Sequence, residues 1–358
     1  MSKIELGIHP IGWTNDDMPE LGDDNTFQQC VSEMALAGYV GTEIGHKYPR
    51  DPAELHSYLD PRGLRVTSCW TSLFLTTKPY EETEKDFIDQ CEFLQAMGAK
   101  CVVVSEQGHS IQGQTETPIF DAKPVFTDEE WDRLTSGLEK LADVAAPYGL
   151  KIAFHHHMGT GVQTTAEIDR LMASTDPSKV FLLLDTGHLV FSGEDPMDIA
   201  TRYLDRIIHV HLKDIRGPQL KQAHEEKQSF LGAIRNGVFT VPGDGIVDVA
   251  SVMKLFKDWI TRGGSWWRLS RIRPRRTRSP TPRWHASTLG RPSGFSFLTT
   301  TKPRPQRSSR SLWAGFGIAS AVLVGVQTTS LRSDHGSEQE DPEISRSLAS
   351  IIEGSRVF

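Results

Sequence analysis

The stretch Gly149-Leu-Lys-Ile-Ala-Phe-His-His-His-Met-Gly-Thr-Gly161 joins a short apolar run to three consecutive histidines, with glycines just beyond. A short apolar run bounded by glycine predicts a buried β-strand. Chemically active residues that gather where a strand ends are typical of parallel α/β folds. The stretch therefore raises the question of whether other strands of the chain end in the same way.

Six further strands are predicted by short β-branched runs along the first 258 residues. Together the seven predicted strands comprise residues 4–9, 39–44, 64–70, 99–105, 150–156, 180–185 and 206–212. Amphipathic helices are predicted at 87–97, 131–146, 166–172 and 247–258, with Gly98 as a C-cap and Thr127 opening a capping box. Strands that alternate with helices predict a parallel sheet, either doubly wound or closed into a (β/α)8 barrel.

The polar residues at the strand ends favour the barrel, whose chemistry gathers at the C-terminal ends of many strands. These ends carry His9, Glu43, Trp70, Glu106 with His109, the histidines 155–157, Asp185 with His188, and His211 with Lys213. No Gly-x-Gly-x-x-Gly motif follows the first predicted strand, so a dinucleotide-binding fold loses its main support. A closed barrel needs an eighth strand just after Asp258, where the sequence changes character.

The balance of charged residues differs before and after residue 258. Residues 1–258 contain 23 Lys and Arg against 40 Asp and Glu, whereas residues 259–358 contain 16 against 6. An acidic body repels phosphate backbones, so we expect no nucleic-acid partner. The four cysteines show no paired short spacing, which argues against a zinc knot or a disulfide framework.

Targeting signals are not evident. The start, MSKIELGIHPIGW, lacks the basic and apolar regions of a signal peptide. The longest apolar run spans residues 312–326 and is shorter than the roughly 18–20 residues that cross a bilayer. We therefore expect a cytoplasmic protein that acts on a small molecule and has no membrane partner, with homo-oligomer formation left open.

Three strand ends carry a metal-ligand set. His155, Asp185 and His211 lie at or one step before the ends of three consecutive predicted strands. Imidazole and carboxylate groups suit a divalent transition metal such as Mn²⁺ or Co²⁺. A single strand-end histidine is more often a structural hydrogen-bonding group. Three groups in register, with His188 three residues after Asp185, predict a metal site instead.

Further candidates surround this set. Because strand side chains alternate, His157 shares the face of His155 if the strand continues, and His156 packs outward. A turn at Met158 would let either His156 or His157 contact substrate. Glu43 is a candidate for proton transfer or for holding a hydroxyl, since unpaired carboxylates are rarely buried.

Four more residues are candidates from their loops. Trp13 and Asn15 in the first loop, and Arg216 beyond the seventh predicted strand, are candidate substrate contacts. Lys213 and Asp214 close the motif His-Leu-Lys-Asp. Lys213 is a candidate for proton transfer, and a solvated loop pair is the alternative for both.

Five segments together resemble a known family. They are Gly7-Ile-His-Pro-Ile-Gly-Trp-Thr-Asn-Asp-Asp17, Phe154-His-His-His-Met-Gly-Thr160, Asp185-Thr-Gly-His188, His209-Val-His-Leu-Lys-Asp214 and Phe239-Thr-Val-Pro-Gly-Asp-Gly245. Over residues 1 to about 258 they resemble the inosose dehydratases of myo-inositol catabolism, in the xylose-isomerase-like barrel superfamily. Asp-Thr-Gly-His and His-Leu-Lys-Asp mark only the superfamily, whereas the first segment and the histidine triplet point to the dehydratases.

The resemblance implies a TIM barrel with a metal held by His155, Asp185, His211 and a glutamate on strand eight. No acidic residue occurs in residues 259–333, so that glutamate is missing. The implied reaction is dehydration of a 2-keto-myo-inositol to a cyclohexane dione, and the resemblance alone implies glutathione as a cofactor. The alternatives are a metal-dependent sugar isomerase or epimerase, and a catalytically inactive remnant or binding module.

The implied chemistry requires proton transfer. The metal would polarise the ketone, a base would remove the adjacent proton, and a general acid would assist loss of the β-hydroxyl. Glu43, His188 and Lys213 are the candidates for these transfers, and the sequence does not assign them individually.

Codons offer an explanation for the missing glutamate. Ser265-Trp-Trp-Arg268 can be spelled so that the frame starting at the third base of the Ser265 codon reads Val-Val-Glu. Synonymous codons extend this to Asp-Tyr-Gln-Gly-Trp-Ile-Val-Val-Glu-Ala-Glu-Gln-Asp-Pro-Ala. We hypothesise that the frame shifts near Asp258, so that residues 1–258 form a barrel without its eighth strand and 259–358 an accidental, disordered tail. The rival interpretation of the tail is an evolved nucleic-acid-binding arm.

Overall fold

A computed structural model describes residues 2–262 and 321–328. Seven parallel strands are present: β1 (Ser2–Ile8), β2 (Gly41–Ile44), β3 (Arg65–Leu73), β4 (Cys101–Glu106), β5 (Lys151–His155), β6 (Val180–Asp185) and β7 (Ile207–Leu212). All seven predicted strands are confirmed, with ends shifted by at most three residues.

Together with β10 (Ala321–Thr328), these strands close into a barrel in the order β1-β10-β7-β6-β5-β4-β3-β2. Every position of β4 and β6 is buried, as expected for parallel strands covered by the barrel interior on one face and by helices on the other. The prediction of a TIM barrel is confirmed, and the doubly wound alternative is wrong.

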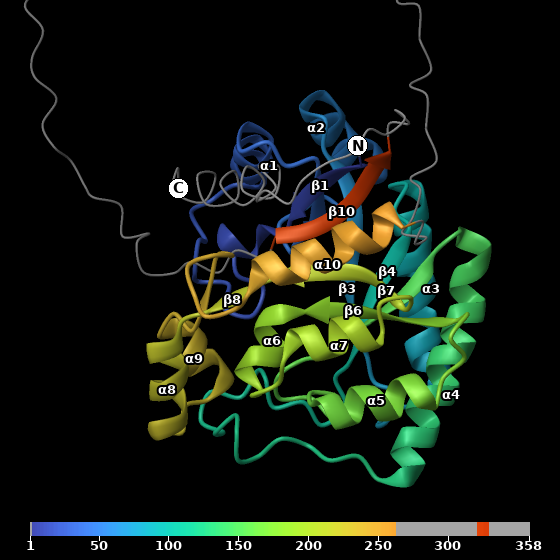
Figure 1. Cartoon of the computed structure of the whole chain (residues 1–358). Helices are drawn as coiled ribbons and strands as arrows, with labels where there is room; N and C mark the ends of the chain where they lie inside the picture. The colour runs from blue at the N-terminus through green and yellow to red at the C-terminus, as the bar shows by residue number, and fades with distance from the viewer. Residues whose placement is uncertain (1, 263–320, 329–358) are drawn as a thin grey trace, which may run out of the picture.

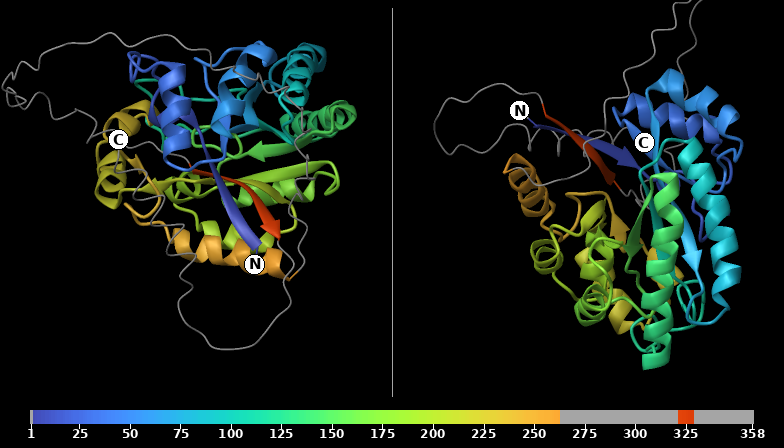
Figure 2. Two further views of the ribbon diagram at one scale, coloured as in Figure 1. Left: turned by 90° about the horizontal axis from the view of Figure 1, so that it is seen from above. Right: turned by 90° about the vertical axis from the view of Figure 1, so that its right-hand side faces the viewer.

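The eighth place in the barrel is filled by β10 (Ala321–Thr328), which runs antiparallel to both neighbours. It pairs with β1 from Ser2↔Thr328 to Ile8↔Ala321, and with β7 through Ala321↔Leu212 and Val322↔His211. Figure 2 shows β1 and β10 side by side. No eighth parallel strand occurs in the described ranges, and β10 pairs with the edges of both β1 and β7.

Ten helices surround the strands within the described part of the chain (Figure 1). They are α1 (Phe27–Leu36), α2 (Pro52–Leu59), α3 (Tyr80–Ala96), α4 (Asp128–Ala145), α5 (Thr165–Ala173), α6 (Thr186–Phe191), α7 (Pro196–Arg202), α8 (Gly217–Glu225), α9 (Phe230–Arg235) and α10 (Val249–Thr261). The predicted capping box is confirmed by Thr127 and Glu130 at the start of α4. Gly98, after α3, has a positive φ of 72° that suits a C-cap glycine.

The predicted boundary at residue 258 falls inside α10, which continues to Thr261 and whose apolar face is buried. Apart from residues 259–262 and β10, the expectation of a disordered tail lies outside the described residues. None of the described helices combines the length and the apolar character that crossing a bilayer requires.

A two-stranded sheet follows β7. Its strands are β8 (Asp214–Ile215) and β9 (Phe239–Thr240), and α8 and α9 lie between them in the sequence. The buried carboxylate of Asp214 accepts hydrogen bonds from the backbone N–H groups of Ile215, Gly243, Gly245 and Val247 at 2.8–3.0 Å. A Cβ on Gly245 would lie 2.3 Å from Asp214 Oδ1, so only glycine fits there. Asp214 therefore holds a loop, and its interpretation as a solvated residue is wrong.

The pairing of β10 predicts an unequal response to proline. Val322 pairs with both Gly7 and His211, whereas Val324 lies at a bulge and has no assigned partner. Proline lacks the N–H that a central strand donates. Val322→Pro should therefore lower the free energy of unfolding by about 1 kcal/mol more than Val324→Pro. Urea unfolding followed by circular dichroism measures the difference, and equal effects would contradict the pairing.

Candidate metal centre

The C-terminal ends of the parallel strands surround a cavity of about 140 Å³. Its lining consists of His9, Ile11, Asp16, Asp17, Glu43, Trp70, Val103, Gln112, His155, His157, His211 and Lys213. Five of the sequence-predicted site residues are in this lining: Glu43, His155, His157, His211 and Lys213. Much of this cavity is thus lined by residues that were predicted at strand ends.

His155, Asp185 and His211 converge beside this cavity, and all three are buried. Asp185 Oδ2 lies 3.3 Å from His155 Nε2 and 3.4 Å from His211 Nδ1. Two ligand atoms held at ~2.1 Å by one tetrahedral cation lie about 3.4 Å apart. The spacing of these donor atoms therefore matches a metal site.

The chemistry of the donors also fits a cation. Asp185 Oδ2 is buried and no hydrogen bond reaches it, although Lys213 Nζ lies 3.0 Å away. Burial lowers the pKa of His155 to about 4, so its imidazole is neutral at pH 7, the form that binds metals. Two imidazoles and one carboxylate suit a divalent transition metal and leave coordination positions for water or substrate.

Asp185 is positioned by the turn that follows β6. Its Oδ1 accepts the backbone N–H of His188 at 3.0 Å and so caps α6. Its own backbone N–H donates to His156 Nε2 at 3.2 Å. Burial by itself raises the pKa of Asp185, but Lys213 and the nearby histidines hold it well below its usual range. Oδ1 thus stabilises the start of α6, while Oδ2 faces the other two candidate ligands, His155 and His211.

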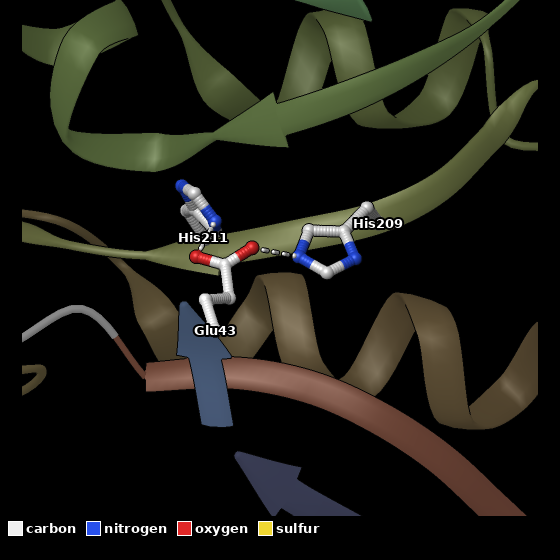
Figure 3. A group of neighbouring side chains, drawn as sticks. All are labelled: Glu43, His209 and His211. Atoms are coloured by element: carbon white, nitrogen blue, oxygen red, sulfur yellow. Dashed lines mark hydrogen bonds and ion pairs between the residues drawn. The ribbon is translucent and has the colours of Figure 1, made fainter. Parts of the chain in front are cut away.

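Glu43 forms a second cluster on the other side of His211 (Figure 3). Its Oε1 accepts from His209 Nε2 at 2.9 Å and from the hydroxyl of Ser68, and its Oε2 lies 3.0 Å from His211 Nε2. Burial by itself raises the pKa of Glu43, but His211 and His209 hold it well below its usual range. Glu43 is therefore an ionised carboxylate with both oxygens in contact with partners.

His209 was not selected from the sequence. The signal that could have found it is the His-x-His spacing of β7, because residues two apart on a strand share a face. Burial lowers the pKa of His209, yet Cys101 and Glu43 raise it to about 10 overall. His209 and Glu43 therefore form a buried ion pair.

Lys213 and His188 lie together beyond Asp185. Lys213 Nζ is 3.0 Å from Asp185 Oδ2 and 3.1 Å from His188 Nε2. His188 is buried against the rings of Phe230 and Phe239 and is not part of the cavity lining. Of this pair, only Lys213 is placed to contact a ligand in the cavity.

The triplet divides as the alternation predicted. His155 and His157 line the cavity, whereas His156 does not and contacts the backbone of Asp185. His157 Nδ1 lies 2.9 Å from the carbonyl of Met158. A cavity contact is therefore open to His157 and not to His156.

Trp13 and Asn15 are not in the cavity lining. The indole N–H of Trp13 donates to Glu33. Asn15 Oδ1 accepts the backbone N–H groups of Asp17 and Met18 at 2.9 Å each. Both side chains thus shape the first loop, and their positions do not support the substrate contacts expected from the sequence.

Arg216 is also outside the cavity lining, because its guanidinium pairs with Asp244 at 3.0 Å and donates to backbone carbonyls next to β9. The lining instead includes Asp16, Asp17 and Gln112, none of which was selected as a candidate. Loop residues of this kind carry no periodic signal that would have found them.

Known proteins resemble both the sequence and the fold. The family model described as xylose isomerase-like TIM barrel matches residues 31–259. Inosose dehydratase from Lacticaseibacillus casei is 60% identical over 255 residues, which cover 71% of this chain and 86% of that protein. The enzyme from Geobacillus thermodenitrificans is 61% identical over 253 residues, covering 71% and 85%. The chain belongs to the inosose dehydratase family.

Solved structures share the fold at lower identity. A probable 3-DHS dehydratase from Bacillus anthracis has a TM-score of 0.55 and 17% identity, covering 71% of this chain and 89% of that chain. The IolI protein, solved with a bound zinc atom, has a TM-score of 0.51 and 18% identity, covering 70% and 85%. The family predicted from the sequence motifs is confirmed.

Loss of the Asp185 charge should abolish tight metal binding. Asp185 and Asp195 both cap a helix with their side chains, α6 and α7 respectively, and asparagine is an equally good N-cap. We expect Asp185→Asn to weaken Co²⁺ binding more than about 100-fold, because a neutral amide lacks the negative charge with which a deprotonated carboxylate holds the cation. Asp195→Asn, the control, should leave it unchanged. Isothermal titration calorimetry measures both, and unchanged affinity in Asp185→Asn would contradict the site.

Proposed function

We propose that this chain is a metal-dependent hydro-lyase that dehydrates a 2-keto-myo-inositol to a cyclohexane dione in inositol catabolism. The observation that carries the proposal is the convergence of His155, Asp185 and His211 beside Lys213 at one cavity. The 60% identity to inosose dehydratases supports the substrate class.

His155, Asp185 and His211 would hold the cation, for which we propose Mn²⁺ or Co²⁺. When bound there, the cation would supply Lewis acidity toward the ketone oxygen of the substrate. His9, Asp16, Asp17 and Gln112 offer polar atoms on the cavity lining to the hydroxyl groups of a polyol.

We assign the proton transfer at the substrate to Lys213. Lys213 lines the cavity, whereas His188 lies behind it, 3.1 Å from Nζ. Glu43 also lines the cavity, but both its oxygens contact protein donors. Lys213 Nζ would therefore take up the proton next to the ketone and return it to the departing β-hydroxyl, which leaves as water. His188 Nε2 would exchange that proton with Lys213.

A sugar isomerase or epimerase would use the same cation and the same first proton transfer, but would return the proton instead of expelling water. Several epimerases share the barrel fold at 16–20% identity, and this similarity supports only the fold. The close dehydratase relatives favour dehydration. An assay for the ultraviolet absorbance of the dione distinguishes the two, because only dehydration creates that chromophore.

Glutathione stays a prediction from the family resemblance alone. We derive no step through it. The cytoplasmic location, the absence of nucleic-acid and membrane partners and any homo-oligomer stay predictions from the sequence.

Removing the ammonium of Lys213 should stop turnover without preventing metal binding. We expect Lys213→Met to lower kcat by about 10²–10⁴-fold, the range typical of general acid–base groups. Lys227, which forms an exposed ion pair with Asp121, gives the matched control Lys227→Met, with kcat unchanged. Formation of the dione from keto-inositol measures both. A Lys213→Met enzyme with near-wild-type kcat would refute the assignment.

We further propose that residues 259–358 are translated out of frame, which the end of the family match at residue 259 supports. A chain restored to the alternative frame after Asp258 gains a strand-eight glutamate. It should bind Co²⁺ more tightly and dehydrate keto-inositol faster than the 358-residue chain. Calorimetry and the dione assay compare the two chains. Equal affinity and equal turnover would contradict either the frame shift or the fourth ligand.

A further inference from the structure

His211 has partners on opposite sides of its ring. Its Nδ1 lies 3.4 Å from Asp185 Oδ2, and its Nε2 lies 3.0 Å from Glu43 Oε2. A histidine that binds a metal through one nitrogen carries its hydrogen on the other. The group that accepts this hydrogen fixes both the tautomer and the orientation of the ring.

We propose that Glu43 is a positioning residue that accepts the Nε2–H of His211 and thereby keeps Nδ1 free of hydrogen and facing His155 and Asp185. The inference rests on the proposed metal centre and deepens it. It replaces the proton-transfer role that the sequence suggested for Glu43, because Glu43 acts through His211 and not on the substrate.

The carboxylate of Glu43 is itself held from the other side. His209 Nε2, at 2.9 Å, and the hydroxyl of Ser68 both donate to Oε1. Glu43 projects from β2, while His209 and His211 belong to β7, as Figure 3 shows. Rotating this buried carboxylate would leave those donors without a partner, which is costly. Oε2 is therefore fixed against His211.

Direct binding of the same cation by Glu43 is inconsistent with this geometry. The two nitrogens of an imidazole point away from each other, so a cation at Nδ1 lies on the far side of the ring from Glu43 Oε2.

The orientation of the His211 ring is especially important in this chain. Residues 259–333 contain no acidic residue that could serve as a strand-eight ligand. With three protein ligands available, a wrong tautomer of His211 would leave only His155 and Asp185.

The variant Glu43→Gln tests the inference sharply. A carboxylate offers two accepting oxygens, whereas an amide offers one acceptor and one donor. Because His209 and Ser68 both donate at Oε1, the amide oxygen stays there and the NH₂ group faces His211 Nε2. That nitrogen must then accept, which moves the ring hydrogen to Nδ1 and blocks the metal position.

The experiment compares the full-length wild type, Glu43→Gln and the control Glu130→Gln, which changes a glutamate that pairs with His109 outside the cavity lining. Nitrogen-15 NMR of the metal-free chains reports the His211 tautomer, and calorimetric titration with Co²⁺ reports affinity. We expect Nε2–H in the wild type and in Glu130→Gln, and Nδ1–H in Glu43→Gln. Co²⁺ binding should weaken about 10–100-fold in Glu43→Gln, with the visible absorption bands of the saturated complex preserved.

An unchanged tautomer in Glu43→Gln, or Co²⁺ affinity equal to that of the wild type, would overturn the inference. So would shifted absorption bands at saturation, because they would make Glu43 a ligand. If the wild-type chain itself binds no Co²⁺, the proposed function fails, and the tautomer measurement still decides the role of Glu43.

Discussion

The carboxylate of Asp185 is the group on which the candidate site depends. It is buried at the end of β6, where an ionised oxygen is unfavourable without a positive partner. Its Oδ1 is committed to the N-terminus of α6, so that only Oδ2 faces Lys213, His155 and His211. The geometry of the metal centre follows from this division, because capping fixes the rotation of the side chain.

The barrel explains why His155, Asp185 and His211 converge although the described residues contain no eighth parallel strand. The ligands and their partners come from β2, β5, β6 and β7, all within the part of the chain that resembles the dehydratases. The antiparallel strand β10 pairs with β1 and β7 and so satisfies backbone groups that would otherwise be exposed. It restores closure of the sheet, but its sequence, Ala-Val-Leu-Val-Gly-Val-Gln-Thr, brings no carboxylate.

Neighbouring residues have different roles because successive side chains of a strand point to opposite faces. Lys213 reaches the cavity, while Asp214 turns to the backbone of the loop that follows β9. His155 and His157 line the cavity, while His156 contacts the backbone of Asp185. A motif such as His-Leu-Lys-Asp therefore combines a chemical residue with a structural one, and only the surroundings separate them.

The sequence by itself determined the seven parallel strands, the candidate ligands at their ends and the family, because periodicity and strand-end chemistry are local properties of the chain. The tertiary structure decided what depends on distant partners. Glu43 and His209 are 166 residues apart, and only closure of the barrel brings β2 and β7 close enough for them to pair. Trp13, Asn15 and Arg216 carried suitable chemistry, yet their hydrogen bonds keep them out of the cavity. Trp13 donates to Glu33 of α1, Asn15 accepts from its own loop, and Arg216 donates to the carbonyl of Gly237 before β9. The direction in which a loop side chain turns is set by such packing, which leaves no periodic trace in the sequence.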